Sequence, residues 1–216
     1  MPSILHITAI KIGVTERKSP IYGESHCIFQ HVLQYLSAQY HTDQIAPISN
    51  SYKDTYKMKI TILCVGKVKE SFYRDAIKEF EKRLSRYCKL NIIEVADEKT
   101  PDQASDTEVA QIKEKEGERL LKSIKEDGYL ICLAIDGAQP DSVKLAKKIE
   151  SIGINGISHL YFVIGGSLGL SDAVLKRADY KLSFSNMTFP HQLMRVILLE
   201  QIYRSYRIIN HEPYHK

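Results

Sequence analysis

The sequence contains no long uninterrupted apolar run. A helix that crosses a bilayer needs roughly 18 or more consecutive apolar residues, and no segment of the 216 residues approaches that length. The first apolar segment, SILHITAIKIGV, is interrupted by His6, Thr8 and Lys11, which is not the pattern of a secretory leader. These absences predict a cytoplasmic protein that makes no contact with a membrane.

Cysteine is sparse, with four residues in the chain and no Cys-x-x-Cys pair. Cys64, Cys88 and Cys132 stand among apolar neighbours, a setting typical of small buried hydrophobic residues, and Cys27 lies apart from them. We therefore expect neither a metal site nor a disulfide framework.

A strong excess of one charge is absent as well, because the formal net charge is only +4. Much of the charge alternates in sign along IKEFEKRLSR and IKEKEGERLLKSIKE, which is typical of solvated helix faces. A protein that held nucleic acid through bulk electrostatics alone would be more basic. If RNA is the partner, a local patch or a structured assembly has to provide the recognition.

Apolar residues make up 44% of the chain, as in a globular protein. From Met58 onward, strand patterns alternate with amphipathic helix patterns. Strands are predicted at 58–65, 90–95, 129–135, 159–165 and 180–184, and helices from about 71, at 105–126, at 141–152, from 171 and at 191–207. This alternation predicts an α/β domain with a mostly parallel sheet and helices on both faces.

Residues 1–57 do not share that alternation. They contain one helical pattern, at about 24–40, between irregular polar segments. Two interpretations stay open: an N-terminal appendage or small accessory domain, or a gene start placed upstream of the true initiator Met58. The predicted domain accordingly spans 58–216.

The segment FVIGGSLGL stands between a predicted buried strand and a helix. Glycines at such a place let the backbone approach a ligand and leave helix N–H groups free. Gly165, Gly166 and Gly169 do not have the G-x-G-x-x-G spacing of a dinucleotide site, and no Lys-Ser/Thr pair completes a P-loop. A tight turn without a ligand is the alternative interpretation.

The same residues read G-x-S-x-G around Ser167, and Asp179 and His191 follow in the order that α/β-hydrolases use. A serine hydrolase is therefore the competing enzyme hypothesis. Against it, only one predicted strand follows Ser167, and the sequence has no oxyanion segment of the HGGG type.

A loop longer than a strand–helix connection requires precedes the last helix, in LSFSNMTFPHQLMRVILLEQIYRS. Pro190 at the helix entry gives His191 a simple first-turn interpretation. The apolar positions of this helix extend beyond what one side of a sheet needs, which favours a homodimer. These positions are Leu193, Val196, Ile197 and Leu199.

The chain ends in IINHEPYHK, where His211, Tyr214 and His215 are crowded into a short run that no core requires. A terminus is usually frayed. Titratable and aromatic groups together there nevertheless indicate the edge of a site.

Several motifs together resemble the SPOUT class of methyltransferases, and closely the ribosomal RNA large subunit methyltransferase H family. They are KITILCVGK, KEGERLL, LAIDG, FVIGGSLGL, the 182–205 segment and the terminal PYHK, in order over 58–216. The resemblance implies a C-terminal trefoil knot, which is otherwise rare in proteins, and S-adenosylmethionine bent among the knot loops. The residues it assigns to the cofactor are Leu133, Gly165, Phe184, Ser185, Asn186, Met187, Thr188 and Phe189. Residues 1–57 have no counterpart in the family pattern.

The activity implied by the resemblance is methylation of N3 of a pseudouridine in 23S ribosomal RNA, within the assembled large subunit or 70S ribosome. With the apolar face of the last helix and the cysteine pattern described above, we expect the enzyme to be a homodimer without a metal ion. Such chemistry requires a proton acceptor and groups that stabilise charge on the base. The candidate catalytic residues are His215, Tyr214, Arg195 and His191. Two alternatives stay open: packing roles for Arg195 and the tail, and an RNA-binding assembly factor without turnover.

Overall fold

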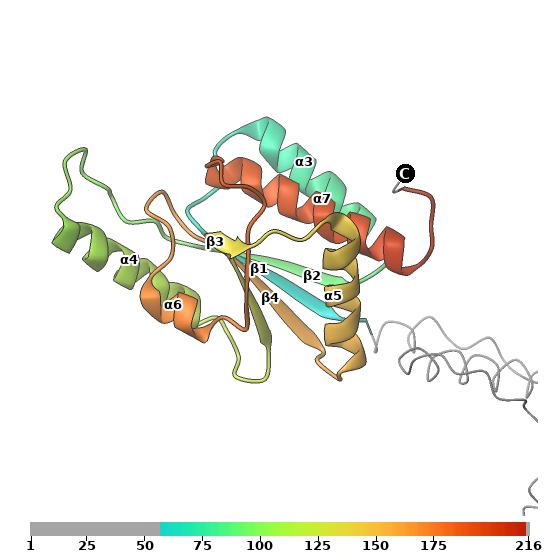
Figure 1. The fold of residues 1–216 in the computed structure, drawn as a ribbon. Helices are drawn as coiled ribbons and strands as arrows, with labels where there is room; N and C mark the ends of the chain where they lie inside the picture. The colour runs from blue at the N-terminus through green and yellow to red at the C-terminus, as the bar shows by residue number, and fades with distance from the viewer. Residues whose placement is uncertain (1–56, 215–216) are drawn as a thin grey trace, which may run out of the picture. The chain divides into compact units, whose positions relative to one another are not determined.

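The computed structural model describes residues 57–214, which belong to one compact unit (Figure 1). Its strands are β1 (Lys59–Val65), β2 (Lys89–Val95), β3 (Tyr129–Ala138), β4 (His159–Ile164) and β5 (Tyr180–Leu182). Its helices are α3 (Ser71–Leu84), α4 (Asp106–Leu121), α5 (Ser142–Ile154), α6 (Asp172–Arg177) and α7 (His191–Ile209). The expectations for 1–56, including the helix at 24–40, lie outside the described residues, as does His215.

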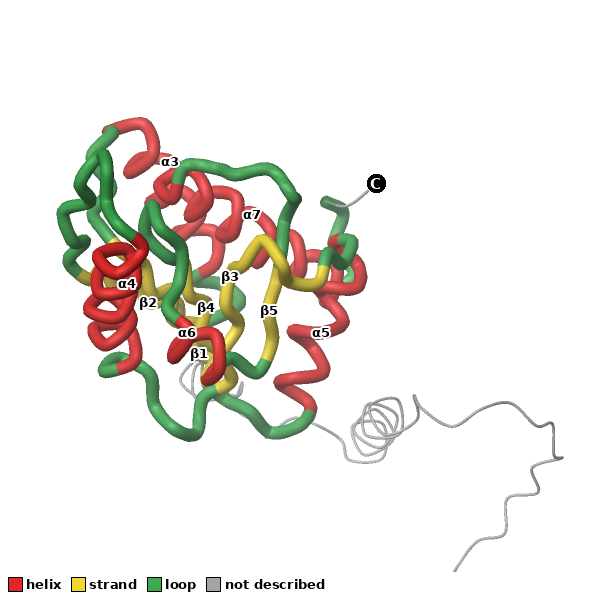
Figure 2. The backbone as a smooth tube through the Cα atoms, turned by 60° about the vertical axis from the view of Figure 1, so that its left-hand side comes forward, coloured by secondary structure: helices red, strands yellow, loops and turns green. Residues whose placement is uncertain are grey.

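The strands form one parallel sheet in the order β2-β1-β4-β3-β5. Helices α4 and α6 lie together on one face, and α3, α5 and α7 cover the other (Figures 1 and 2). The predicted α/β class, with a mostly parallel sheet between helices, is therefore confirmed. The trefoil knot stays a prediction.

The central strands β1 and β4 are buried on both faces, which is why their sequences are almost continuously apolar. Alternate side chains enter different cores because successive strand residues point to opposite faces. Ile60 and Ile62 pack with α3, α5 and α7, whereas Leu63 and Val65 pack with α4 and α6. The three cysteines of the described residues are free and buried, as expected for small hydrophobic side chains.

Several predicted boundaries were wrong, among them the end of β3, which continues to Ala138 and does not stop at 135. Helix α4 ends at Leu121 and not near 126, because the N–H groups of Ser123 and Ile124 donate three residues back and tighten the last turn. Strand β5 ends at Leu182 and not at 184, since Ser183 already donates to Ala138 at the irregular end of β3.

In the described part of the chain, no helix has both the length and the apolar character needed to cross a membrane. Helix α7 is the longest of these helices, with 19 residues, but Arg195, Glu200, Arg204 and Arg207 interrupt its apolar sequence.

Candidate active site

A cavity of about 690 Å³ lies at the carboxyl ends of β3, β4 and β5. This is the edge at which open parallel sheets bind ligands. Three segments enclose it: residues 133–135 of β3, the glycine loop 164–169 after β4, and the segment 182–194 that joins β5 to α7. Loops that lie far apart in sequence therefore meet because their strands are neighbours in the sheet.

The wall contributed by β3 depends on an irregularity in that strand. The β3–β5 pairing runs in register through Leu133 and then resumes only at Ala138. The intervening residues include Ala134 and Ile135, which line the cavity, and the Ile135 side chain is 59% exposed. The break in pairing thus leaves an apolar segment facing the cavity instead of the neighbouring strand.

The glycine loop is tight, because its first residues lie close to the backbone of its last residue. A Cβ atom built on Gly165 would be 2.8 Å from the carbonyl carbon of Gly169 and 3.1 Å from Leu170 Cδ2. Gly169 itself has φ +86°, a conformation that favours glycine, and has open space around it. Gly165 is therefore required for the tight loop itself, and a larger side chain such as valine at this position would disturb the fold of the loop as well as any cofactor contact.

The segment 183–190 is held by bonds within itself. Ser183 donates its hydroxyl to the carbonyl oxygen of Ser185 at 3.1 Å, and the Ser185 hydroxyl accepts the N–H of Met187 at 3.0 Å. Phe184, Thr188 and Phe189 line the cavity beside Met187, whose side chain is 70% exposed. The long loop noted in the sequence therefore forms a large part of the cavity wall.

His191 lies on the cavity wall at the first position of α7. A Cβ atom built on Gly66 would lie 3.7 Å from His191 Nε2 and 3.6 Å from Asp97 Cγ, so the two side chains approach each other across Gly66. Burial lowers the pKa of His191, Arg195 and Lys69 lower it further, and Asp97 raises it. Among the described residues that line the cavity, His191 is the one with an ionisable side chain.

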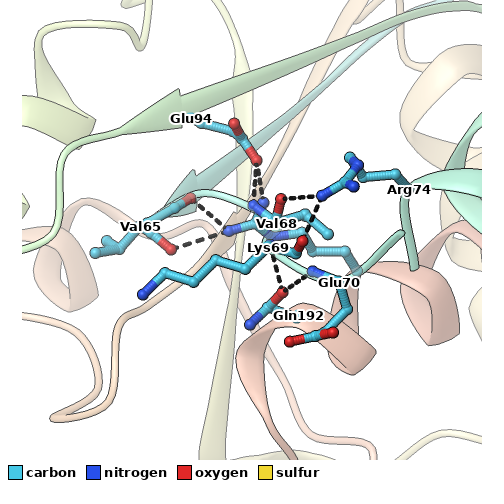
Figure 3. Close-up of polar contacts among 9 residues, drawn as sticks. Val65, Val68, Lys69, Glu70, Arg74, Glu94 and Gln192 are labelled. Atoms are coloured by element: carbon cyan, nitrogen blue, oxygen red, sulfur yellow. Dashed lines mark hydrogen bonds and ion pairs between the residues drawn. The ribbon is translucent and has the colours of Figure 1, made fainter. Parts of the chain in front are cut away.

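Arg195 is buried below the cavity and is not among the residues that line it. Its guanidinium donates to the carbonyl oxygens of Val65 at 3.0 Å and Gly66 at 2.6 Å, and forms an ion pair with Glu94 (Figure 3). These contacts tie α7 to the carboxyl ends of β1 and β2. These contacts support the packing role that was the alternative for Arg195. Arg195 follows His191 by one turn of α7.

Three other expected site residues lie away from the cavity wall or outside the described residues. Asn186 is not among the lining residues; its side-chain oxygen accepts a hydrogen bond from Gln139 at 2.8 Å. Tyr214 donates to Glu200 at 3.2 Å and meets the Tyr203 ring edge-on, beside the middle of α7, and it is not among the residues that line the cavity. His215 lies outside the described residues.

The remaining expected cofactor residues do meet at the cavity. They are Leu133, Gly165, Phe184, Ser185, Met187, Thr188 and Phe189. Sequence reasoning did not single out Ile164 or Met194, which also line it. The position of Ile164, at the carboxyl end of a fully buried strand, was the signal that could have identified it.

The hydrolase arrangement is not present. Asp179 accepts the N–H of Leu130 at 2.7 Å and pairs with Arg177, at the amino ends of β3 and β5. Ser167 lies at the opposite edge of the sheet, where its hydroxyl is 3.5 Å from that of Thr100. The serine hydrolase hypothesis was therefore wrong, because the sheet separates its proposed acid from its proposed nucleophile.

Residues 58–215 match the family model described as "Predicted SPOUT methyltransferase". The chain is also similar to proteins named ribosomal RNA large subunit methyltransferase H. Those of Bifidobacterium adolescentis and Clostridium tetani are 65% and 62% identical to it over 159 residues, which are 74% of this chain and 100% of each relative. The chain belongs to the SPOUT methyltransferases and, within them, to the ribosomal RNA large subunit methyltransferase H family.

The cavity has the size and chemistry to hold S-adenosylmethionine. Ligand pockets of about 300–1,000 Å³ hold molecules of this class, with mostly apolar walls and a few polar groups. Leu133, Ile164 and Phe184 provide apolar surface, and the backbone of the glycine loop is accessible from the cavity. Among residues 57–214, no three His, Cys, Asp or Glu side chains are grouped so that they could hold a metal ion.

Proposed function

We propose that this protein transfers a methyl group from S-adenosylmethionine to N3 of a pseudouridine in 23S ribosomal RNA, within the large subunit or the 70S ribosome. The observation that carries the proposal is the cavity at the carboxyl edge of the sheet, where the glycine loop, the 183–190 loop and His191 meet. The relatives' names support ribosomal RNA as the substrate. Such a substrate assigns the activity to the cytoplasm.

The cofactor contacts that we propose come from three walls of the cavity. Leu133 and Phe184 cover the flat faces of the adenine, and the glycine-loop backbone beside Gly165 offers polar groups to its edge. Ser185 and Thr188 provide hydroxyl groups in the same wall. When bound, the cofactor supplies an electrophilic methyl group on a positively charged sulfur.

Methylation at N3 forms an N–C bond while the S–C bond breaks, and the N3 proton has to leave. We assign proton acceptance to His191, because its imidazole borders the cavity and its lowered pKa keeps it neutral at pH 7. Arg195 contributes by holding the β1 end and the start of α7 together. A water molecule bound by His191 would serve the same purpose.

We further propose a homodimer that uses the outer side of α7. Leu193 and Ile197 are four residues apart, so they share one helix face, and both are only partly buried in the single chain. Leu199, which was expected at the partner surface, is fully buried in the core of its own chain and does not contribute to that surface. Light scattering tests the dimer, and Ile197→Glu is expected to give monomers, with Lys147→Glu on α5 as the matched exposed control.

The tail fits this assembly better than it fits one chain alone. Tyr214 folds back along α7 to Glu200, which follows His191 by roughly 14 Å along the helix at about 1.5 Å per residue. Tyr214 therefore does not line the cavity of its own chain. In a dimer that brings the two α7 helices together antiparallel, the tail of one copy approaches the cavity of the other, and His215 and Tyr214 are then available to the RNA base.

The knot is part of the same proposal. Segment 183–190 leaves β5 at one edge of the sheet, and α7 then packs beside α3 and α5 (Figure 2). We propose that this return passes through the loop formed by the chain before it. A knotted loop would hold the cofactor walls at fixed separations even when the cavity is empty.

The decisive experiment is incubation with labelled S-adenosylmethionine and ribosomes from a strain lacking the gene, followed by nucleoside analysis. The expected product is a pseudouridine methylated at N3, and ribosomes that already carry the methyl group are the control. Labelled RNA methylated at another base would correct the target. Cofactor binding without any methyl transfer would favour the RNA-binding assembly factor.

The Ser167→Ala variant is expected to leave methyl transfer largely intact.

A further inference from the structure

In the segment Gly66–Glu70, between β1 and α3, most residues form backbone hydrogen bonds to side chains of neighbouring elements. The N–H of Val68 donates to Glu94 at 3.1 Å, and the N–H of Lys69 donates to Gln192 at 2.8 Å. Arg74 donates to the carbonyl oxygens of Val68 and Lys69 (Figure 3). The backbone of this loop is therefore fixed from β2, α3 and α7 at once.

The same contacts place the loop beside the cavity. Gln192, which accepts the N–H of Lys69, is the neighbour of the cavity residue His191. Arg195, one turn further along α7, holds the carbonyl oxygen of Gly66. These hydrogen bonds involve the backbone of the loop and not its side chains. The outward-facing side chains of the loop are therefore available for another role.

Two side chains of this loop and one from the adjoining first turn of α3 are exposed. Lys67 and Lys69 have no ion pair with any residue that the structure describes, and no contact is drawn to the Lys69 ammonium in Figure 3. Phe72, in the first turn of α3, is 59% exposed and its ring centroid lies 4.2 Å from that of Tyr73. Two free cations beside an exposed aromatic ring are the combination that holds single-stranded nucleic acid.

We propose that Lys67, Lys69 and Phe72 form an RNA-binding surface beside the cavity. The two ammonium groups contact phosphate oxygens, and the phenyl ring stacks on an unpaired base next to the target nucleotide. This inference rests on the proposed function and names the residues that present the RNA to the cavity. The rigid loop limits the entropy that the protein loses when the RNA strand is bound.

Charge complementarity favours RNA over a protein partner at this surface. Glu94 beneath the loop is already paired with Arg195, so it does not cancel the lysine charges. Within Gly66–Glu70, two lysines and one glutamate leave a net charge of +1, and exposed Arg74 adds another cation. Because the net charge of the whole chain is modest, RNA recognition has to come from a local patch of this kind or from the structured assembly that carries the RNA.

The first test measures methyl transfer to ribosomes for Lys67→Gln/Lys69→Gln. At pH 8, where His191 is neutral in either protein, we expect the KM for ribosomes to rise about 10-fold, with kcat and the Kd for S-adenosylmethionine unchanged. Because Lys69 lowers the pKa of His191, the acid limb of kcat should move to higher pH in this variant. The dependence of log kcat/KM on log salt should become shallower by about 1.4, because each phosphate contact on a single strand contributes about 0.7. The matched control is Lys122→Gln/Lys125→Gln, which removes two exposed lysines at the opposite edge of the sheet.

The second test is Phe72→Ala, with Phe72→Tyr as the conservative variant. We expect the alanine variant to raise the KM about 5- to 10-fold without changing the salt dependence, because stacking does not release counterions. Tyrosine should restore the KM to within about 2-fold. Ile154→Ala, which shortens another exposed apolar side chain on the far end of α5, is the control and should have no effect.

The outcomes separate this inference from the proposed function. If the wild-type protein transfers no methyl group to ribosomes, the proposed function fails. If it is active and the lysine variants behave like their control, the RNA surface is wrong. A change in the monomer–dimer balance of Phe72→Ala, seen by light scattering, would also overturn it by assigning Phe72 to a protein interface.

Discussion

His191 combines a position on the cavity wall with a pKa that its surroundings lower. Burial and the cations Arg195 and Lys69 disfavour the protonated imidazole, and Asp97 acts in the opposite direction. The imidazole is therefore neutral at pH 7 and stays neutral below the usual pKa of a histidine. If this imidazole accepts the proton, turnover should decrease only at acidic pH, where the imidazole becomes protonated.

We predict that kcat falls on the acid side below pH 6.5, where the neutral imidazole is lost. Asp97→Asn removes the charge that raises this pKa, so the acid limb should move to lower pH. His191→Ala should reduce kcat by roughly 100-fold, the usual scale for lost acid–base catalysis. Transfer rates from pH 5 to 8 at saturating ribosomes provide the measurement, and an unmoved limb in Asp97→Asn would contradict the assignment.

We expect alanine to have different effects at Gly165 and at Gly169 of the glycine loop. Gly165→Ala would place a Cβ 2.8 Å from backbone, so the loop must shift, and we expect at least a 10-fold weaker Kd for S-adenosylmethionine together with lower stability. Gly169→Ala meets open space and only the strain of φ +86°, which costs about 1 kcal/mol. Calorimetry and chemical unfolding compare the two, and equal effects would count against this geometry.

At the scale of the elements, α7 connects the cavity to the loop that follows β1. Its residue Arg195 bonds two backbone carbonyl groups and Glu94, all more than 100 positions away in sequence. Its Gln192 accepts the N–H groups at the start of α3. Helix α7 thereby fixes the position of the cavity wall relative to the proposed RNA surface.

Replacing Arg195 by leucine should therefore destabilise the protein more than it changes the chemistry. The substitution leaves the carbonyl oxygens of Val65 and Gly66 without their donor, and unpaired buried groups cost about 1–3 kcal/mol each. We expect the free energy of unfolding to fall by about 2–4 kcal/mol, measured in urea. A stable variant with greatly reduced kcat and an intact Kd for S-adenosylmethionine would instead assign Arg195 to catalysis.

The tail can be tested only by a small change, because its first residues are structural. Glu212 pairs with Arg86 and Arg207, so removing the whole segment from His211 would also disturb the end of α7. His215→Ala avoids that disturbance. We expect it to cut methyl transfer by roughly 100-fold while the Kd for S-adenosylmethionine and the dimer are unchanged. Full activity would exclude His215 from catalysis.

At the scale of the whole molecule, the family match begins where the strand and helix alternation begins. The family model starts at residue 58, and the relatives cover 159 residues of this chain over their full length. Strand β1 starts at Lys59 and lies between β2 and β4, so the sheet requires the chain from that point onward.

We predict that a protein beginning at Met58 folds and keeps its activity, because every strand of the described sheet is retained. The measurements are the thermal unfolding midpoint and the rate of methyl transfer to ribosomes, each compared with the full chain. An insoluble or inactive product would make residues 1–57 a functional domain.

The local elements and the glycine loop were predictable because they depend on neighbours in sequence. Apolar periodicity identified the strands and helices, and the continuous apolar character of β1 and β4 indicated burial on both faces. Periodicity does not reveal the order of the strands in the sheet, and this order decides which strand ends lie next to each other. Only that order gave Arg195 its carbonyl partners and separated Asp179 from Ser167. Only the return of the tail along α7 placed Tyr214 against Glu200 and away from the cavity wall.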